Sequence, residues 1–201
     1  MRLEIAGGWV DLDRPRGALA LLVLTHGAGG GVGTRDVLAV RDAATASGVA
    51  VALLTQPYRV AGRRAPPAPA PQDAAWLEIV AALRKRRGLA ALPLFVGGRS
   101  NGARLAARTA DRLGATGVVA LAYPLHPPGK PERSRLDELE AAGCPVLVVQ
   151  GERDPFGMPP AGAGRTVEVI PGADHALRRD VAHIAELVVT FVTTTAPRGT
   201  V

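Results

Sequence analysis

Ser100 lies in the segment Gly98-Arg99-Ser100-Asn101-Gly102, which has the pattern Gly-x-Ser-x-Gly. An apolar stretch precedes the segment and a helical pattern follows it. The serine is therefore expected on a sharp turn between a strand and a helix, with its hydroxyl projecting above the sheet edge. The other two serines of the chain lack glycines on both sides. The pattern indicates a nucleophilic serine, and the alternative is a tight glycine-rich turn without catalytic chemistry.

A serine hydroxyl becomes a good nucleophile when a base takes its proton and a carboxylate orients that base. Asp154 follows the apolar stretch 146–150, and His175 follows a second stretch that ends at Ile170. Both are expected on loops beyond the carboxyl ends of strands, at the same sheet edge as Ser100. Serine, then aspartate, then histidine is also one of the known chain orders of such a triad.

Other acids and histidines compete for these roles. Glu152 directly follows the strand and has little reach, and Asp174 is next to the base in sequence instead of across from it. We therefore expect Asp154 to be the acid. His183 has the spacing of a helix-face residue, His126 lies among prolines, and His26 begins a glycine-rich loop.

That loop, Thr25-His26-Gly27-Ala28-Gly29-Gly30-Gly31, directly follows a predicted strand. Glycines let backbone N–H groups turn inward, where they stabilise the oxyanion of acyl transfer, each supplying about 3 kcal/mol. The expected donors are the N–H groups of Ala28 and Asn101. A phosphate-binding loop is the alternative, but no Lys-Ser or Lys-Thr follows the last glycine, and no dinucleotide-binding pattern is present.

The elements that position these residues alternate between short apolar stretches and amphipathic ones. Because the apolar stretches are nearly continuous, both faces of the sheet should be covered, which predicts an α/β fold with a mostly parallel sheet. The first two short strands, Leu3–Ile5 and Trp9–Leu12, are expected as an antiparallel edge. The other strands are expected at 18–24, 49–54, 94–96, 118–121, 146–149 and 166–170, and the helices at 34–47, 72–87, 100–113, 136–142 and from about 177 to 191.

Two proline-rich segments separate these elements. Residues 56–72 are expected as a semi-rigid extended loop, without a domain boundary, because the strands on either side belong to one sheet. Residues 123–133 form a second loop.

Together, four segments resemble the α/β-hydrolase superfamily. They are His26–Gly30, Gly98–Gly102, Tyr123–Lys130 and Gln150–Gly157. They look most like the small, capless dienelactone-hydrolase-like branch, which includes the hydrolase-like domain of a chromatin-complex subunit and a testis-expressed protein. The resemblance implies Ser100 as nucleophile, Asp154 as acid, His175 as base and an oxyanion loop at Ala28. Dienelactone hydrolases themselves carry a cysteine as nucleophile, whereas this chain has a serine.

The substrate site is expected to be shallow and open, since larger members of the superfamily insert a lid where this chain has only the loop 123–133. Its predicted lining residues are Tyr123, Leu125, His126, Phe156 and Met158. Arg99 and Arg153 are either solvated charges or contacts for a substrate carboxylate.

Composition limits the other possibilities. With 201 residues, of which 47% are hydrophobic and 21% charged, the chain is expected to form one domain over 1–201. The apolar run Ala18–Leu24 is too short to cross a membrane. The N-terminal sequence lacks the apolar core of a signal peptide, and the single cysteine, Cys144, cannot form an internal disulfide. A cytoplasmic location is therefore expected.

Lys and Arg outnumber Asp and Glu by 24 to 18, which raises the question of an anionic partner. The one dense basic run, Arg84–Arg87, is expected at the end of a helix, where it complements the helix dipole. Aromatic residues make up only 3%, so few platforms exist for stacking unpaired bases. No nucleic acid or membrane partner is expected, and the oligomeric state stays open.

The leading hypothesis is a serine hydrolase that cleaves a small carboxylic ester or thioester through an acyl-serine intermediate, without metal or organic cofactor. Acyl transfer or thioester release in a biosynthetic pathway is a second hypothesis. A non-catalytic binding or scaffold module on the same fold is a third, because fold does not fix function.

Overall fold

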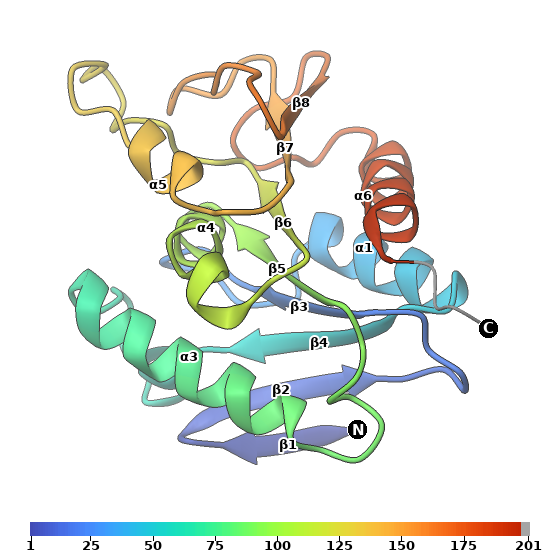
Figure 1. Ribbon diagram of the computed structural model, residues 1–201. Helices are drawn as coiled ribbons and strands as arrows, with labels where there is room; N and C mark the ends of the chain where they lie inside the picture. Colours follow the sequence, from blue (N-terminus) through green and yellow to red (C-terminus); the bar gives the residue numbers. More distant parts are fainter. Residues whose placement is uncertain (198–201) are drawn as a thin grey trace.

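The computed structural model describes residues 1–197. An eight-stranded sheet with the order β1-β2-β4-β3-β5-β6-β7-β8 runs through the molecule (Figure 1). Its strands are β1 (Arg2–Ile5), β2 (Gly8–Asp13), β3 (Leu21–Thr25), β4 (Ala50–Thr55), β5 (Leu94–Arg99), β6 (Gly117–Leu121), β7 (Val146–Gly151) and β8 (Arg165–Ile170). The six strands β3 to β8 are parallel to one another, whereas β1 and β2 form an antiparallel edge. Both features match the prediction.

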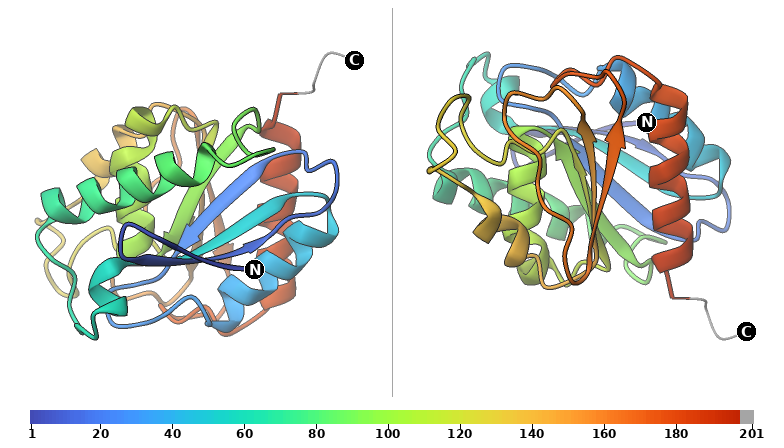
Figure 2. Two further views of the ribbon diagram at one scale, coloured as in Figure 1. Left: turned by 90° about the horizontal axis from the view of Figure 1, so that it is seen from below. Right: turned by 90° about the horizontal axis from the view of Figure 1, so that it is seen from above.

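Helices cover both faces of the sheet (Figure 2). One face carries α1 (Arg35–Ala46) and α6 (Val181–Thr195), which pack against each other. The other face carries α3 (Pro69–Arg84), α4 (Asn101–Leu113) and α5 (Leu136–Glu140), and the short α2 (Pro57–Val60) follows β4. Because each central strand buries side chains on two sides, β3, β6 and β7 have no exposed residue.

Two hydrophobic cores result, one on each face. The first joins Trp76 and Leu83 of α3 to Leu105 of α4 and to the sheet residues that point toward them. The second joins Val40 of α1 and Val188 of α6 to the opposite sheet face. Parallel strands sandwiched in this way leave only their ends accessible, so functional side chains gather where the strands end.

Among the boundaries that differ from the sequence prediction, the starts of α2, α3 and α6 have causes in the backbone. Residues 56–72 are not one extended loop, since α2 begins at Pro57 and α3 at Pro69. Proline suits the first helical turn, where its missing N–H is not needed. The last helix begins at Val181 instead of about Leu177, because Leu177 and Asp180 have positive φ angles of 46° and 51°.

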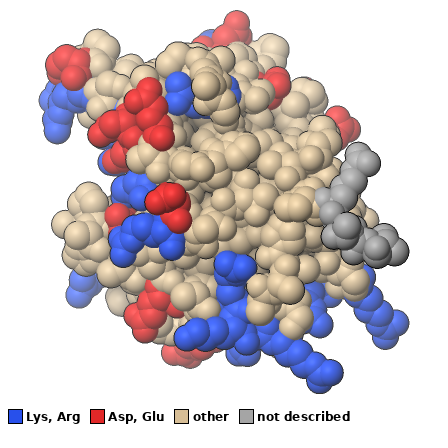
Figure 3. Space-filling view, in the orientation of Figure 1, with Lys and Arg blue, Asp and Glu red and all other residues tan. Residues whose placement is uncertain are grey.

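The basic run Arg84–Arg87 is expected from the sequence at the end of a helix, but α3 ends at Arg84 and the other three residues lie beyond the helix. Lys85, Arg86 and Arg87 are exposed, and blue side chains gather in the lower part of the face shown in Figure 3. Within residues 1–197, no helix is long and apolar enough to cross a membrane. The last four residues of the predicted domain 1–201 lie outside the described residues.

Candidate active site

Ser100 stands at the turn between β5 and α4 in a strained conformation. Its φ and ψ angles are 54° and −115°, and a positive φ is unfavourable for a residue with a Cβ atom. The strain is held by contacts on both sides, since the Ser100 N–H donates to Leu121 O at 2.9 Å and the Ser100 carbonyl accepts bonds from α4. The hydroxyl is thereby fixed at the carboxyl edge of the sheet.

Two glycines allow this turn to pack closely on the end of β3. Thr25 is paired with Gly98 in the sheet register. A Cβ atom on Gly98 would lie 2.6 Å from Thr25 O, and one on Gly102 would lie 2.7 Å from His26 O. The elbow and the loop after β3 therefore approach each other backbone to backbone, as the sequence pattern predicts.

Gly102→Ala is expected to destabilise the protein by about 1–3 kcal/mol, because the added methyl overpacks the contact with the β3 end. At an exposed helix position the same change would stabilise the protein by about 1 kcal/mol. A loss of unfolding free energy in Gly102→Ala would therefore indicate the close backbone contact. Urea unfolding measures the effect. Gly31→Ala is the control, since its Cβ would meet nothing within 4 Å. Equal stability of Gly102→Ala and wild type would contradict the close approach.

Three side chains from separate loops meet at the elbow. His175 Nε2 lies 3.0 Å from Ser100 Oγ, and His175 Nδ1 lies 2.8 Å from Asp154 Oδ2. A carboxylate accepts only, so Nδ1 carries the proton and donates to Asp154. Nε2 is then free to accept the proton of the serine hydroxyl. These three residues have the geometry of a nucleophile, a base and an acid that orients the base.

Asp154 is held by two further donors. Gln150 Nε2 donates to Asp154 Oδ2 at 2.9 Å, and the Phe156 N–H donates to Oδ1 at the same distance. The Asp154 side chain is only 1% exposed, so these bonds fix its direction. The Phe156 ring lies against the His175 ring, with 4.3 Å between centroids. Sequence reasoning missed Gln150, although it is a polar residue at the end of an apolar strand.

The two rival acids, Glu152 and Asp174, form hydrogen bonds with backbone N–H groups and not with the His175 ring. Glu152 accepts from the Gly172 N–H at 2.6 Å, and Asp174 accepts from the Ala176 N–H at 2.9 Å. Arg153 donates to the Gly172 carbonyl. These three exposed residues form hydrogen bonds with the loop that carries His175, and none of the three bonds to its ring.

The loop after β3 passes close to Ser100. A Cβ atom on Gly27 would lie 3.3 Å from Ser100 Cβ, so the loop runs directly past the nucleophile. Within residues 1–197, the N–H groups of Ala28 and Asn101 donate to no protein acceptor. Tyr58 fixes the loop by donating from its hydroxyl to Ala28 O at 2.8 Å. Burial raises the pKa of Tyr58 to about 12, so the phenol stays protonated.

His26 is a structural residue of this loop. It is fully buried. Nε2 accepts from the Gln56 N–H at 3.0 Å, so Nδ1 donates to Gly27 O at 2.8 Å. Gln56 in turn accepts from Gln72 at 2.7 Å. Sequence reasoning missed this network, which ties the loop to β4 and α3.

Replacing His26 by glutamine is expected to flatten the pH dependence of stability below neutrality. Burial, with a smaller contribution from the Arg59 charge, lowers the pKa of His26 below its ordinary value. Well above its ordinary pKa of about 6.5, the histidine is neutral in both states. As the pH falls below that, the unfolded chain binds the proton first, so stability is lost by up to about 1.4 kcal/mol per pH unit.

The measurement is the free energy of unfolding in urea at several pH values between 7 and 5. The other three histidines are the same in wild type and His26→Gln, so their contributions cancel in the difference of slopes. If the free energy of unfolding changed with pH equally in wild type and His26→Gln, His26 would take up a proton as readily when folded as when unfolded.

The five predicted substrate contacts differ in burial and in the groups that they contact. Phe156 is half-buried beside His175 and Met158 is 39% exposed. His126 packs against Gly157 and donates its N–H to Phe156 O. Leu125 packs against the core. Tyr123 is fully buried and its hydroxyl donates to Arg135 O at 2.8 Å, so the prediction that it lines an open pocket is wrong. Its phenol reaches inward to support the following loop.

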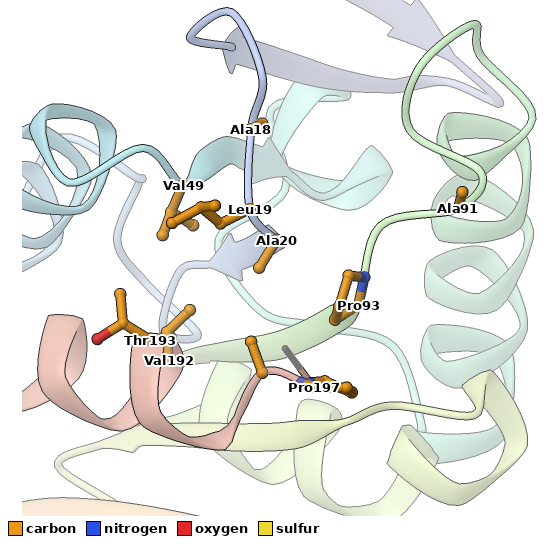
Figure 4. Close-up of a pocket in the computed structure, with 10 residues that line it drawn as sticks. Ala18, Leu19, Ala20, Val49, Ala91, Pro93, Val192, Thr193 and Pro197 are labelled. Atoms are coloured by element: carbon orange, nitrogen blue, oxygen red, sulfur yellow. The ribbon is translucent and has the colours of Figure 1, made fainter. Parts of the chain in front are cut away.

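The cavities do not all adjoin the site. One of about 580 Å³ lies between α6 and the amino ends of β3 and β5 (Figure 4). Its lining is mostly apolar and includes Leu19, Pro93 and Val192. It is at the sheet edge opposite Ser100. A hollow of about 520 Å³ adjoins the site and is lined by Arg99 and Ala176, the chain neighbours of Ser100 and His175, and by the start of α1.

Sequence comparison identifies one family. A family model described as "Alpha/beta hydrolase domain" matches residues 18–187. No curated protein matches the chain.

Several solved structures have the same fold. XC6422 from Xanthomonas campestris, described as an α/β serine hydrolase without a lid, is 18% identical with a TM-score of 0.77, covering 100% of this chain and 96% of that one. A dienelactone hydrolase from Anabaena variabilis is 18% identical (TM-score 0.76; coverage 94% and 93%). Est1E from Butyrivibrio proteoclasticus, solved with ferulic acid, is 17% identical (TM-score 0.74; coverage 97% and 98%).

The predicted fold class and the predicted likeness to lid-less, dienelactone-hydrolase-like proteins are thus confirmed. The likeness to the chromatin-complex subunit and the testis-expressed protein stays a prediction.

Proposed function

Because the chain belongs to the α/β-hydrolase domain family, we propose that it hydrolyses small carboxylic esters or thioesters through an acyl intermediate on Ser100. The observation that supports this most directly is the continuous hydrogen-bonded series from Ser100 Oγ through His175 to Asp154, with distances of 3.0 and 2.8 Å. A binding module has no need of a strained serine with a base and an oriented carboxylate.

Acylation begins when Ser100 Oγ attacks the carbonyl carbon of the substrate while its proton moves to His175 Nε2. The negative charge that develops on the substrate oxygen is stabilised by the N–H groups of Ala28 and Asn101. When the tetrahedral intermediate collapses, the bond to the alcohol or thiol breaks. His175 returns the proton to this leaving group, and the acyl group remains on Ser100.

Deacylation repeats these steps with water in place of the serine. His175 Nε2 removes a proton from water, whose oxygen attacks the acyl carbon, and the same two N–H groups stabilise the second oxyanion. Collapse releases the carboxylic acid and returns the proton to Ser100. Asp154 stays ionised throughout, because its role is to hold the Nδ1 tautomer and to stabilise the imidazolium.

The lack of a lid in the loop between β6 and α5 supports a choice of substrate class. The loop 122–135 between β6 and α5 contributes no helix or strand that could close over Ser100. Phe156 and Met158 offer a limited apolar surface. Short acyl groups and esters with an aromatic portion are the best candidates, and methyl ferulate belongs in the first substrate panel because Est1E was solved with ferulic acid.

The first experiment treats the purified protein with a fluorophosphonate and locates the adduct by peptide mass spectrometry. Labelling of Ser100 in the wild type and loss of labelling in His175→Ala are expected. Hydrolysis rates on a small panel then define the acyl and leaving groups. The panel contains p-nitrophenyl acetate, its thioester counterpart p-nitrophenyl thioacetate, p-nitrophenyl butyrate and methyl ferulate. Circular dichroism shows that each variant is folded. A folded wild type without label or turnover would favour the binding or scaffold module instead.

A further inference from the structure

Arg99 joins the nucleophile turn, the loop that carries His175 and helix α1, which follows the proposed oxyanion loop. It is the last residue of β5, directly before Ser100. Its Nη2 donates to the carbonyl of His175 at 2.6 Å. Its Nε lies 3.3 Å from Asp36 Oδ2, and Asp36 is in the first turn of α1, which follows the oxyanion loop. One side chain therefore touches the nucleophile turn, the base loop and the helix behind the oxyanion loop.

We propose that Arg99 is a positioning residue that sets His175 relative to Ser100, with Asp36 as its anchor. The inference rests on the proposed function. Within the described residues, Arg99 is the one side chain that donates to the His175 carbonyl. The base lies on the loop between β8 and α6, outside regular structure. Without Arg99, the backbone at His175 loses the contact that ties it to the elbow.

Asp36 is the ion-pair partner of the Arg99 guanidinium. The side chain of Asp36 is 1% exposed and that of Arg99 is 17% exposed, so each charge depends on the other. A guanidinium is planar and rigid, so Nε can face the Asp36 carboxylate as an ion pair, without hydrogen-bond geometry, while Nη2 donates to the His175 carbonyl. A lysine has a single ammonium on a flexible stem and cannot hold both directions as firmly.

A substrate-binding role for Arg99 makes different predictions. Arg99 and the exposed Arg178 line the same hollow beside the site. If the hollow bound an anionic group of the substrate, removal of either charge would raise KM for anionic esters and leave neutral esters unaffected. A positioning residue instead acts on kcat for every substrate, because it acts through His175.

The test measures kcat and KM on neutral p-nitrophenyl acetate and on an ester with a carboxylate. The variants are Arg99→Gln, Arg99→Lys, Asp36→Asn and the double variant Arg99→Gln/Asp36→Asn. We expect kcat to fall about 10²-fold in Arg99→Gln with both esters, since a displacement of about 1 Å has an effect of that size. KM should change less than about threefold. The kcat values of Arg99→Lys and Asp36→Asn should each lie between those of wild type and Arg99→Gln.

The double variant separates positioning from stability. Arg99→Gln leaves a buried carboxylate without its partner and lowers the melting temperature. The double variant removes both charges, so the melting temperature should recover in part while kcat stays within about threefold of Arg99→Gln, because two coupled changes do not add. If Arg99→Gln fails to fold, the double variant provides the same comparison.

Arg178→Gln is the matched control, because it removes the same charge from the same hollow and, among the described residues, Arg178 forms no hydrogen bond or ion pair with Asp36 or His175. Wild-type kcat and KM are expected. An Arg99→Gln or double variant with wild-type kcat, or a loss confined to KM for the anionic ester, would overturn the positioning role. A wild type without turnover or Ser100 labelling would instead overturn the proposed function and this inference together.

Discussion

Ser100→Ala is expected to lower kcat for ester hydrolysis by about 10⁶-fold, the size of effect seen when a triad nucleophile is removed. The alanine retains the Cβ atom and so the strained turn, but no atom remains to form the acyl intermediate. What survives is the modest acceleration from substrate binding and the oxyanion donors, about 10³-fold over water. KM should change little, because the hydroxyl contributes mainly to the transition state. Steady-state kinetics with p-nitrophenyl acetate and fluorophosphonate labelling measure both effects.

Ser47→Ala is the matched control. Ser47 is exposed just after the end of α1, and its replacement should leave turnover and labelling unchanged. If Ser100→Ala kept wild-type turnover, the nucleophile would have to be another group. Cys144 is a poor candidate, because burial raises the pKa of its thiol to about 11 and it precedes β7 at the opposite edge of the sheet.

The fold was accessible from the sequence because its signals are local. Nearly continuous apolar strands such as β3 and β7 can only be stable when both faces are covered, and their alternation with amphipathic helices defines the parallel topology. The parallel topology then brings the ends of β5, β7 and β8 to one edge. Ser100, Asp154 and His175 follow those ends, so their meeting could be predicted without coordinates.

The supporting contacts were not accessible, because they join residues far apart in the sequence. Nothing local marks Arg99 as a partner of Asp36, or Gln56 as the link between His26 and Gln72. Tyr123 is the opposite case, in which the sequence position suggests a role that the side-chain direction does not support. A tyrosine at the start of a loop beyond a strand end has the position of a pocket residue, but its ring is in the core, where burial and a bond to Arg135 O stabilise it. Side-chain direction depends on the packing of the whole fold.

Asp154→Asn is expected to lower kcat by about 10⁴-fold with little change in structure. Asp154 accepts three hydrogen bonds, from His175 Nδ1, Gln150 Nε2 and the Phe156 N–H. An asparagine has one acceptor oxygen and one NH₂ group. If its oxygen keeps the fixed Phe156 N–H, its NH₂ faces His175 Nδ1 and donates to it. The histidine proton then moves to Nε2, where it can no longer accept the proton of Ser100.

Gln150 decides which way the asparagine amide turns, because its Nε2 donates to the same carboxylate oxygen that faces His175. Its Nε2 also donates to Tyr123 O and Gly157 O, so turning the Gln150 amide to accept from the asparagine NH₂ would leave those carbonyls without their donor. The loss of about 10⁴-fold therefore belongs to the orientation that keeps the Phe156 N–H bond, whereas an asparagine oxygen that keeps Gln150 and His175 would retain the active tautomer and lower kcat less.

Asp174→Asn is the matched control, since Asp174 is the neighbouring exposed carboxylate and, among the described residues, its side chain bonds only the Ala176 N–H. It should keep kcat within about threefold of wild type. Kinetics on p-nitrophenyl acetate decide between the two acids: a large loss in Asp174→Asn with near-normal turnover in Asp154→Asn would transfer the acid role to Asp174.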